Sequence, residues 1–323
     1  MTLPLLSRRM LLGASTLLLT GARGATEPFV YLLPAPREAI VFAPLVLAEG
    51  DGLFAREGLA VRFEQVAGGG MKVGEALAAG KGDAGGALGD TALILRARDV
   101  RVKGVALLGR HSFLTLIEQA SLPVAGRSLK GRQIGVPSLQ DVSYYALKAL
   151  LRNAGLTPGD VQVLAAPSGT LVEKLGTGEL AAIVGTIDWG VKAERAGVAL
   201  RYRPLDRDYP AVAQGIMASD ATIAGRPDAL RRFVRAVLNA IDGIVRNPDT
   251  AAARYARLAP QSGFSEVEAA RIFRLLACNV YGRRSGRFDP TVMAAAARAA
   301  TQEGLVSHGT DVHASFSNQF VTR

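Results

Sequence analysis

Two periodicities of hydrophobic and polar residues alternate along the chain. Residues 29–33 are β-branched and aromatic and stop at a Pro-Ala-Pro turn, which predicts a first strand. Residues 40–49 are mostly apolar helix formers, and residues 60–66 predict a second strand. Farther along, residues 133–137 and 161–164 predict strands that flank a helix, whose apolar positions recur at helical spacing from Val142 onward. This alternation of strand and helix indicates mainly parallel α/β sheets.

One strand–turn–helix–glycine–strand unit occurs twice. Gly80 and Gly178 lie 98 positions apart, and the same offset relates Asp90 to Asp188 without a gap. Residues 80–85 also match G-x-G-x-x-G, but here the glycines follow a helix-forming run instead of opening a helix. We therefore interpret them as residues that end a helix, not as a dinucleotide-binding loop.

From residue 218 onward the pattern is almost entirely helical. A long apolar stripe occupies residues 230–244. Ser265 and Glu268 have the spacing of a capping box, and Asp289 precedes a proline at the first position of a later helix. The chain therefore consists of two similar α/β units followed by appended helices.

The composition is that of a folded protein and excludes several classes of function. The chain has 323 residues, a length that fits two domains. Hydrophobic residues make up 49% of the chain and charged residues 20%, as in other folded proteins. The net charge of +10 is dispersed and only 6% of residues are aromatic, so we expect no nucleic-acid partner. Cys278 is the only cysteine, and the three histidines have no metal-binding spacing. We predict no metal and no cofactor, and the absence of a visible nucleophile–base set predicts that the protein is not an enzyme.

The N-terminus has the features of an export signal. Arg8 and Arg9 precede a short apolar run, and small residues surround Gly24, which predicts a signal peptide over residues 1–25. The arginine pair resembles the twin-arginine signal, although Leu11 and Gly13 replace the commonest residues of that pattern. No cysteine lies at the cleavage site, so we expect a periplasmic protein without a lipid anchor.

Five segments together resemble the solute-binding proteins of ABC importers. They are PLVLAEGDGLFAREGLAVRF, EALAAGKGDAG, LKGRQIGVP, LLRNAGLTPGDVQV and GRPDALRRFVRAVLNA, in that order over about residues 29–250. The subgroup that they resemble binds nitrate, taurine, alkanesulfonates and thiamine-precursor pyrimidines. The resemblance implies a bilobal type II periplasmic-binding-protein fold, with lobe one at 26–113 and 217–323, lobe two at 114–216, and crossovers near 112–115 and 214–218. It also implies a monomer that binds a small solute and delivers it to an inner-membrane permease.

The candidate ligand-binding residues follow from the position of loops in such a fold. Ligands bind beyond the carboxyl ends of parallel strands, where helix N-termini point. In the first lobe this rule selects Arg37, Gly69, Gly70, Asp90, Arg110 and His111, and in the second lobe it selects Ser138, Asp141, Ser168, Thr186, Asp188 and Trp189.

Several of these residues have an equally plain structural role. Ser138 and Asp141 are also suited to capping their helix. Arg37 is alternatively a solvated loop charge, and His111 alternatively bonds to the backbone.

The residues at the two repeated strand ends are expected to differ in role. Trp189 is either an aromatic clamp at the cleft or a core residue. Asp90 precedes a residue that starts a helix, so we expect it to cap that helix. Asp188 precedes Trp189, so we expect it to contact ligand or hinge.

Two rival functions and two ligand classes stay open. A thiamine-pyrimidine-synthase-like enzyme resembles this family but carries a cysteine-rich segment, which this chain lacks. Ferric-ion-binding proteins of related fold use adjacent tyrosines, as at Tyr144 and Tyr145, but the periodicity buries Tyr145 on a helix face. The solute is either an organic sulfonate or similar anion, or an aminated nitrogen heterocycle.

We predict export by the twin-arginine route. Replacing Arg8 and Arg9 together by lysine keeps the charge but removes the guanidinium pair that this pathway reads. Cell fractionation should then show the protein retained in the cytoplasm. Unchanged periplasmic delivery would show that the pair is not a twin-arginine signal.

Overall fold

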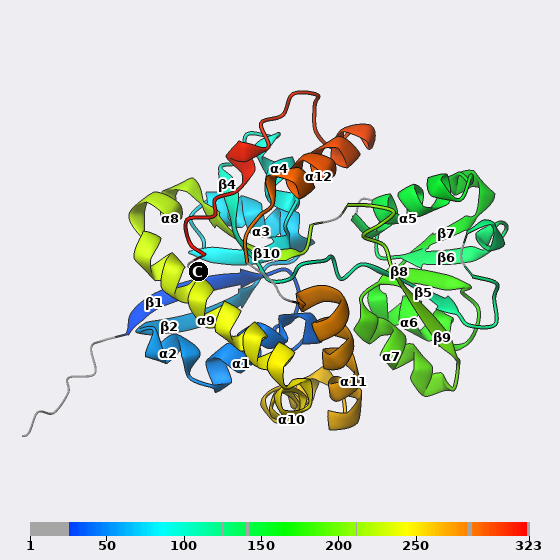
Figure 1. Ribbon diagram of the computed structural model, residues 1–323, viewed down its shortest axis with the longest axis horizontal. Coiled ribbons are helices and arrows are strands. Elements are labelled where there is room, and N and C mark those ends of the chain that lie inside the picture. The colour runs from blue at the N-terminus through cyan, green and yellow to red at the C-terminus, as the bar shows by residue number, and fades with distance from the viewer. Residues whose placement is uncertain (1–25, 125, 140–141, 211, 283–285, 322–323) are drawn as a thin grey trace, which may run out of the picture.

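The computed structural model describes residues 26–124, 126–139, 142–210, 212–282 and 286–321. In this part of the chain two five-stranded sheets lie side by side, each covered by helices (Figure 1). The first has the order β2-β1-β3-β10-β4, from β1 (Glu27–Leu33), β2 (Leu59–Gln65), β3 (Ala84–Leu88), β4 (Val102–Leu107) and β10 (Gln214–Ser219). The second has the order β7-β6-β8-β5-β9, from β5 (Thr115–Gln119), β6 (Gln133–Val136), β7 (Gln162–Ala165), β8 (Ala182–Gly185) and β9 (Leu200–Pro204).

The two sheets share one topology. β1 pairs in parallel with β2 and β3, and β6 pairs in parallel with β7 and β8. The reversed strand, β10 in the first sheet and β5 in the second, is in each case the first strand after the chain has passed from the other sheet. The expectation of mainly parallel α/β sheets is confirmed, with one antiparallel strand inserted in each.

Helices cover both faces of each sheet. On the first sheet, α3 (Gly69–Ala78) and α4 (Thr91–Arg96) lie on one face, and α1 (Ala43–Gly50), α2 (Leu53–Arg56) and α9 (Pro227–Arg246) lie on the other, with α8 (Asp220–Gly225) leading into α9. On the second sheet, α5 (Val142–Asn153) lies opposite α6 (Ser168–Gly176) and α7 (Ile187–Ala193). The C-terminal helices α10 (Pro248–Leu258), α11 (Glu266–Leu276) and α12 (Pro290–Gln302) pack on the first sheet's side. Short 3-10 turns lie at Ile40–Phe42, Arg127–Leu129, Pro158–Asp160, Glu194–Ala196, Pro260–Ser262 and His313–Ser315, and a π-helical turn lies at Ala277–Tyr281. We call the first sheet with its helices and α10–α12 the first unit, and the second sheet with its helices the second unit.

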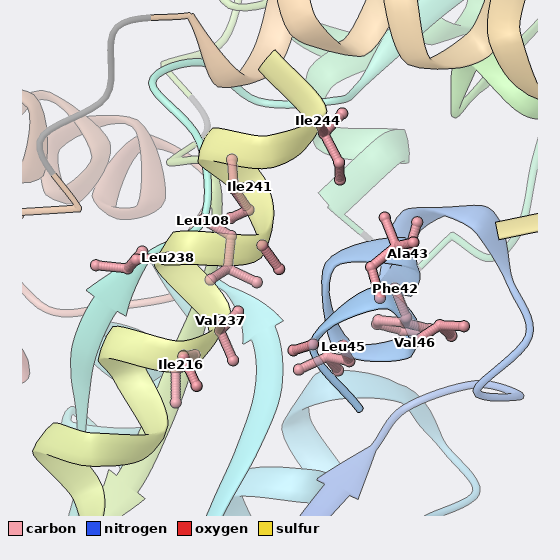
Figure 2. Close-up of a cluster of buried hydrophobic side chains, with 14 of the residues drawn as sticks. Phe42, Ala43, Leu45, Val46, Leu108, Ile216, Val237, Leu238, Ile241 and Ile244 are labelled. Atoms are coloured by element: carbon pink, nitrogen blue, oxygen red, sulfur yellow. The ribbon is translucent and has the colours of Figure 1, made fainter. Parts of the chain in front are cut away.

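The core of the first unit is built on α9. Phe233 of this helix stacks on Phe29 and Tyr31 of β1, with ring centroids 4.6 and 5.0 Å apart, and on Phe54 of α2 at 5.2 Å. Farther along α9, Val237 and Ile241 continue the same apolar face beside α1 (Figure 2). The apolar stripe expected over residues 230–244 therefore is the helix face that covers the sheet.

The sequence repeat corresponds to a repeated piece of backbone. Gly80 follows α3 with φ +73°, and Gly178 follows α6 with φ +80°. β3 begins at Ala84 and β8 at Ala182, so the offset of the repeat is kept in three dimensions. The left-handed conformation at both glycines confirms that they end helices.

The two units are joined by two chain segments that run side by side, one between β4 and β5 and one between β9 and β10. The Leu108 amide donates to the Gln214 carbonyl at 2.7 Å, and the Leu205 amide donates to the Leu114 carbonyl at 3.1 Å. Gln214, within the range expected for the second crossover, is the first residue of β10.

The predicted signal peptide, residues 1–25, lies outside the described residues. Across the described residues, every helix is too short or too polar to cross a bilayer.

The stacked aromatic rings predict a large loss of stability on truncation. Phe233→Ala should lower the free energy of unfolding by about 3–5 kcal/mol, because it leaves a cavity between three rings. Urea unfolding followed by circular dichroism measures this. Val267→Ala, at a side chain that is 80% exposed, is the control and should change stability by less than about 0.5 kcal/mol. Equal effects of the two changes would contradict this account of the core.

Candidate ligand-binding site

Polar residues of both units, several of them buried, interact at two places. The first, the Asp188 cluster, consists of Thr186 and Asp188 of the second unit with Tyr255 and Glu38 of the first. The Thr186 hydroxyl hydrogen-bonds to the Asp188 carboxylate, which is only 8% exposed. The Tyr255 hydroxyl donates to the Glu38 carbonyl at 2.5 Å, which anchors the loop after β1.

Burial and charge shift the pKa values of two residues of the Asp188 cluster. Burial raises the pKa of the Asp188 carboxyl, and the Thr186 hydrogen bond and the Lys192 charge only partly oppose this effect. Burial also raises the pKa of the Tyr255 phenol; a hydrogen bond with Ser262 opposes this effect, and the negative charges of Asp188 and Glu38 add to it. The neighbour of Asp188, Ile187, is buried in the core cluster of the first unit, so Asp188 lies beside a contact between the units.

The second place, the Asp90 cluster, joins three segments that are distant in sequence. Asp90 follows β3 and is 2% exposed, and Tyr209 lies between β9 and β10 and is also 2% exposed. Burial raises the pKa of the Tyr209 phenol, and the charges of Asp90 and Glu303 and the proximity of Tyr145 on α5 raise it further. Tyr209, on the segment that joins the units, thus interacts electrostatically with a carboxylate of the first unit and with a tyrosine of the second.

The segments that join the units are held by polar contacts of their own. His111 Nδ1 lies 3.1 Å from an Asp206 carboxylate oxygen, which links one segment to the other. The amides of Arg110 and His111 donate to the Val280 carbonyl in the π-helical turn, at 2.7 and 3.2 Å. These contacts place His111 at the junction of the units, where it bonds to a side chain as well as through its backbone.

Comparison with known proteins assigns the chain to a family. Residues 39–251 match the NMT1/THI5-like family over more than half of the chain. The chain belongs to this family.

Two relatives and one solved structure are similar to this NMT1/THI5-like protein and differ in function from one another. Riboflavin-binding protein RibY of Chloroflexus aurantiacus is 26% identical over 308 residues, which cover 87% of this chain and 83% of that protein. The 4-amino-5-hydroxymethyl-2-methylpyrimidine phosphate synthase of Aspergillus parasiticus is 28% identical over 243 residues, or 68% of each chain. The periplasmic aliphatic sulphonate binding protein SsuA of Escherichia coli superimposes with a TM-score of 0.72 at 14% identity, over 91% of this chain and 92% of that one. The periplasmic-binding-protein fold expected from the sequence is confirmed.

The arginines predicted as ligand contacts are engaged elsewhere or exposed. Arg37 pairs with Glu38 at 3.6 Å and with Glu49, and its guanidinium lies over the Phe63 ring at 5.4 Å. The Arg110 side chain is exposed beside the joining segment. Of the twelve predicted residues, the structure brings Thr186 and Asp188 into contact and places Asp90 in the second cluster.

The other predicted residues have separate positions. Gly69 and Gly70 begin α3, and a Cβ added at Gly70 would lie 2.8 Å from the Ala87 Cβ, so this glycine lets α3 approach β3 closely. Ser138 and Ser168 are exposed after β6 and at the start of α6. Asp141 lies outside the described residues.

The expected capping role of Asp90 is wrong. Asp90 occupies the N-cap position of α4, but its side chain makes no capping hydrogen bond there. Its carboxylate is buried and acts electrostatically on Tyr209 of the joining segment, which lies far from it in sequence.

Three tyrosines of the clusters were not selected from the sequence. Tyr255 lies on α10 and Tyr209 on a joining segment, and no local pattern distinguishes either from an ordinary core residue. Tyr145 was assigned to a buried helix face, and it is half-buried there, with Lys148 5.2 Å from its ring centroid.

Trp189 packs within the second unit. Its indole lies against the Gly185 backbone, which has no side chain to hinder it. It also packs on the apolar cluster that contains Leu171, Leu175 and Ile183. Trp189 is itself only partly buried, and these contacts favour a packing role over the clamp.

Trp189→Ala should therefore lower the free energy of unfolding by about 3–5 kcal/mol, as expected for a large side chain packed in a core. Urea unfolding is followed by circular dichroism, because the mutation removes the chain's only tryptophan. Leu139→Ala, at a 50% exposed residue of the same unit, is the control. A Trp189 variant of unchanged stability would restore the clamp as the better interpretation.

Proposed function

We propose that this protein is the extracytoplasmic solute-binding component of an ABC importer and closes on a small solute between its two units. The shared fold with a periplasmic binding protein and the similarity to RibY support this function. The predicted signal peptide is consistent with it. The partner is then an inner-membrane permease, which recognises a monomeric closed form, and nucleic acid has no role.

The solute that fits best is an aminated nitrogen heterocycle. The observation that carries this choice is the burial of two carboxylates, Asp90 after β3 of the first sheet and Asp188 in α7 after β8 of the second. A sulfonate or nitrate placed near them would meet like charge at low dielectric, which is costly. Ring amino and imino groups would instead donate to these carboxylates.

The aromatic residues of the clusters agree with a flat ligand. Tyr209 interacts electrostatically with Asp90 and with Tyr145, and Tyr255 interacts electrostatically with Asp188. Aromatic side chains bind heterocycles by stacking while their hydroxyls hydrogen-bond to the ring edge. The names of two relatives each contain a nitrogen heterocycle, riboflavin in one and an aminopyrimidine in the other.

A binding role explains the residues better than the two rivals. The synthase-like enzymes that the sequence resembles carry several cysteines, and this chain has Cys278 alone. A ferric site needs several anionic ligands, and the described residues contain no group of three or more His, Cys, Asp or Glu side chains able to hold a metal.

A thermal-shift screen followed by calorimetry tests the solute class. Riboflavin and 4-amino-5-hydroxymethyl-2-methylpyrimidine should raise the melting temperature, since a ligand at 100 times its Kd stabilises the folded state by about 2.7 kcal/mol. Taurine, an alkanesulfonate and nitrate should not. Stabilisation by the anions alone would overturn the proposed class.

Asp188→Asn should weaken binding of the best heterocycle by about tenfold to a hundredfold, the usual loss for a charge-assisted hydrogen bond. Asp228→Asn is the matched control, because this carboxylate is 83% exposed on α9 and pairs only with Arg231 one turn away. Calorimetry should give the control the affinity of the unmodified protein. Equal affinities for all three proteins would remove Asp188 from the site.

A further inference from the structure

The two units contact each other at two edges, one of them mainly apolar and the other mainly ionic. At the α7–α11 contact, Ile187 and Val191 of the second unit are buried in the same apolar cluster as Ile272 and Phe273 of α11. This cluster is the main core of the first unit. Separating the units here would expose apolar surface, which is unfavourable in proportion to its area.

Paired charges reinforce the α7–α11 contact. Arg195 binds the Glu268 carboxylate through two hydrogen bonds of 2.7 and 2.9 Å and donates to the Gly263 carbonyl at 2.6 Å. Arg271 of α11 binds Glu194 in the same forked manner, with one bond of 3.0 Å. Arg195 first, and then Ser265 of the capping box, lower the pKa of Glu268 to about 2, so this pair stays ionised at neutral and mildly acidic pH.

The α5–α12 contact depends mainly on one carboxylate. Glu303 is the residue at which α12 ends, and its side chain is 5% exposed. It pairs with Lys148 and, at 3.3 Å, with Arg152, both on α5 of the second unit. Ala299 of α12 adds a small apolar contact to the cluster around α5.

The position of Glu303 is unfavourable for its own helix. The C-terminal end of a helix carries partial negative charge, which repels a carboxylate. The two cations that offset this repulsion lie four residues apart on α5 and therefore on one face of it. The carboxylate thus gains its partners only while the second unit lies against α12.

We propose that the second unit rotates about the α7–α11 contact and that Glu303 is the latch that holds the α5–α12 edge closed. Ion pairs are replaced by water and screened by salt far more readily than a shared apolar core is exposed. The two joining segments run side by side and are held together by the Leu108–Gln214 and Leu205–Leu114 backbone hydrogen bonds. The charge of Glu303 also acts on Tyr209 of the Asp90 cluster. The device does not depend on which solute is bound.

The test measures two distances in the ligand-free protein by double electron–electron resonance, in a Cys278→Ser background. One pair of spin labels, at Gln162→Cys on β7 and Val292→Cys on α12, reports the α5–α12 edge. The other pair, at Ala196→Cys and Val267→Cys, reports the α7–α11 edge. All four positions are exposed.

Glu303→Gln should shift the first distance to longer values and leave the second unchanged. Raising salt from about 0.1 to about 1 M, which shortens the Debye length from about 10 to about 3 Å, should do the same to the unmodified protein. Asp249→Asn is the matched control, because Asp249 pairs with Arg274 within the first unit, 2.8 Å away, and should move neither distance.

Two outcomes would overturn the proposal. If Glu303→Gln lengthens both distances alike, the α7–α11 contact is not a pivot. If it lengthens neither, Glu303 is not a latch. Circular dichroism checks that each variant is folded. Arg152→Gln, which removes the exposed partner of Glu303, is a milder variant that should lengthen the first distance in part.

Discussion

The short path of the chain between its two sheets is the constraint on which the rest of the structure depends. Only two segments join the units in the described residues, and backbone hydrogen bonds from Leu108 to Gln214 and from Leu205 to Leu114 keep them together. Both polar clusters combine residues on either side of this junction. Asp188 of the second unit acts electrostatically on Tyr255 of the first, and Asp90 of the first unit acts on Tyr209 of a joining segment.

Burial of carboxylates gives the junction its chemical character. Asp90 and Asp188 occupy equivalent positions in the sequence repeat, and both are almost fully buried. A buried carboxylate is stable only with partners, and Asp188 receives one hydrogen bond from Thr186 while its pKa is raised by desolvation. Such a group gains most from a ligand that donates hydrogen bonds, and it repels an anion. The fold shared with a sulphonate-binding protein therefore does not by itself decide the solute, since fold and ligand are separable.

The C-terminal helices do more than complete the first core. α11 and α12 both extend to the second unit, one through an apolar surface with forked Arg–Glu pairs and the other through Glu303. In the Ser265–Glu268 capping box, one residue both caps a helix and contacts the other unit. The Glu268 carboxylate accepts a hydrogen bond of 2.8 Å from the Ser265 amide at the start of α11, and it also pairs with Arg195 of the second unit. Helix start and contact between units are thus coupled through a single carboxylate.

The sequence alone determined the local elements, because their signals are local. The period of residues 230–244 predicted the buried face of α9, the spacing of Ser265 and Glu268 predicted a cap, and the repeated glycines predicted two helix ends. The order of strands and helices, with the family resemblance, predicted the bilobal α/β fold. The partners of each polar side chain were decided by the tertiary structure. Arg37 pairs with Glu49 and lies over Phe63, the Asp90 side chain makes no capping bond at the start of α4, and Trp189 packs on Gly185. Tyr255 and Glu303 could not be recognised beforehand, because each meets its partners only after segments more than a hundred residues apart have packed together.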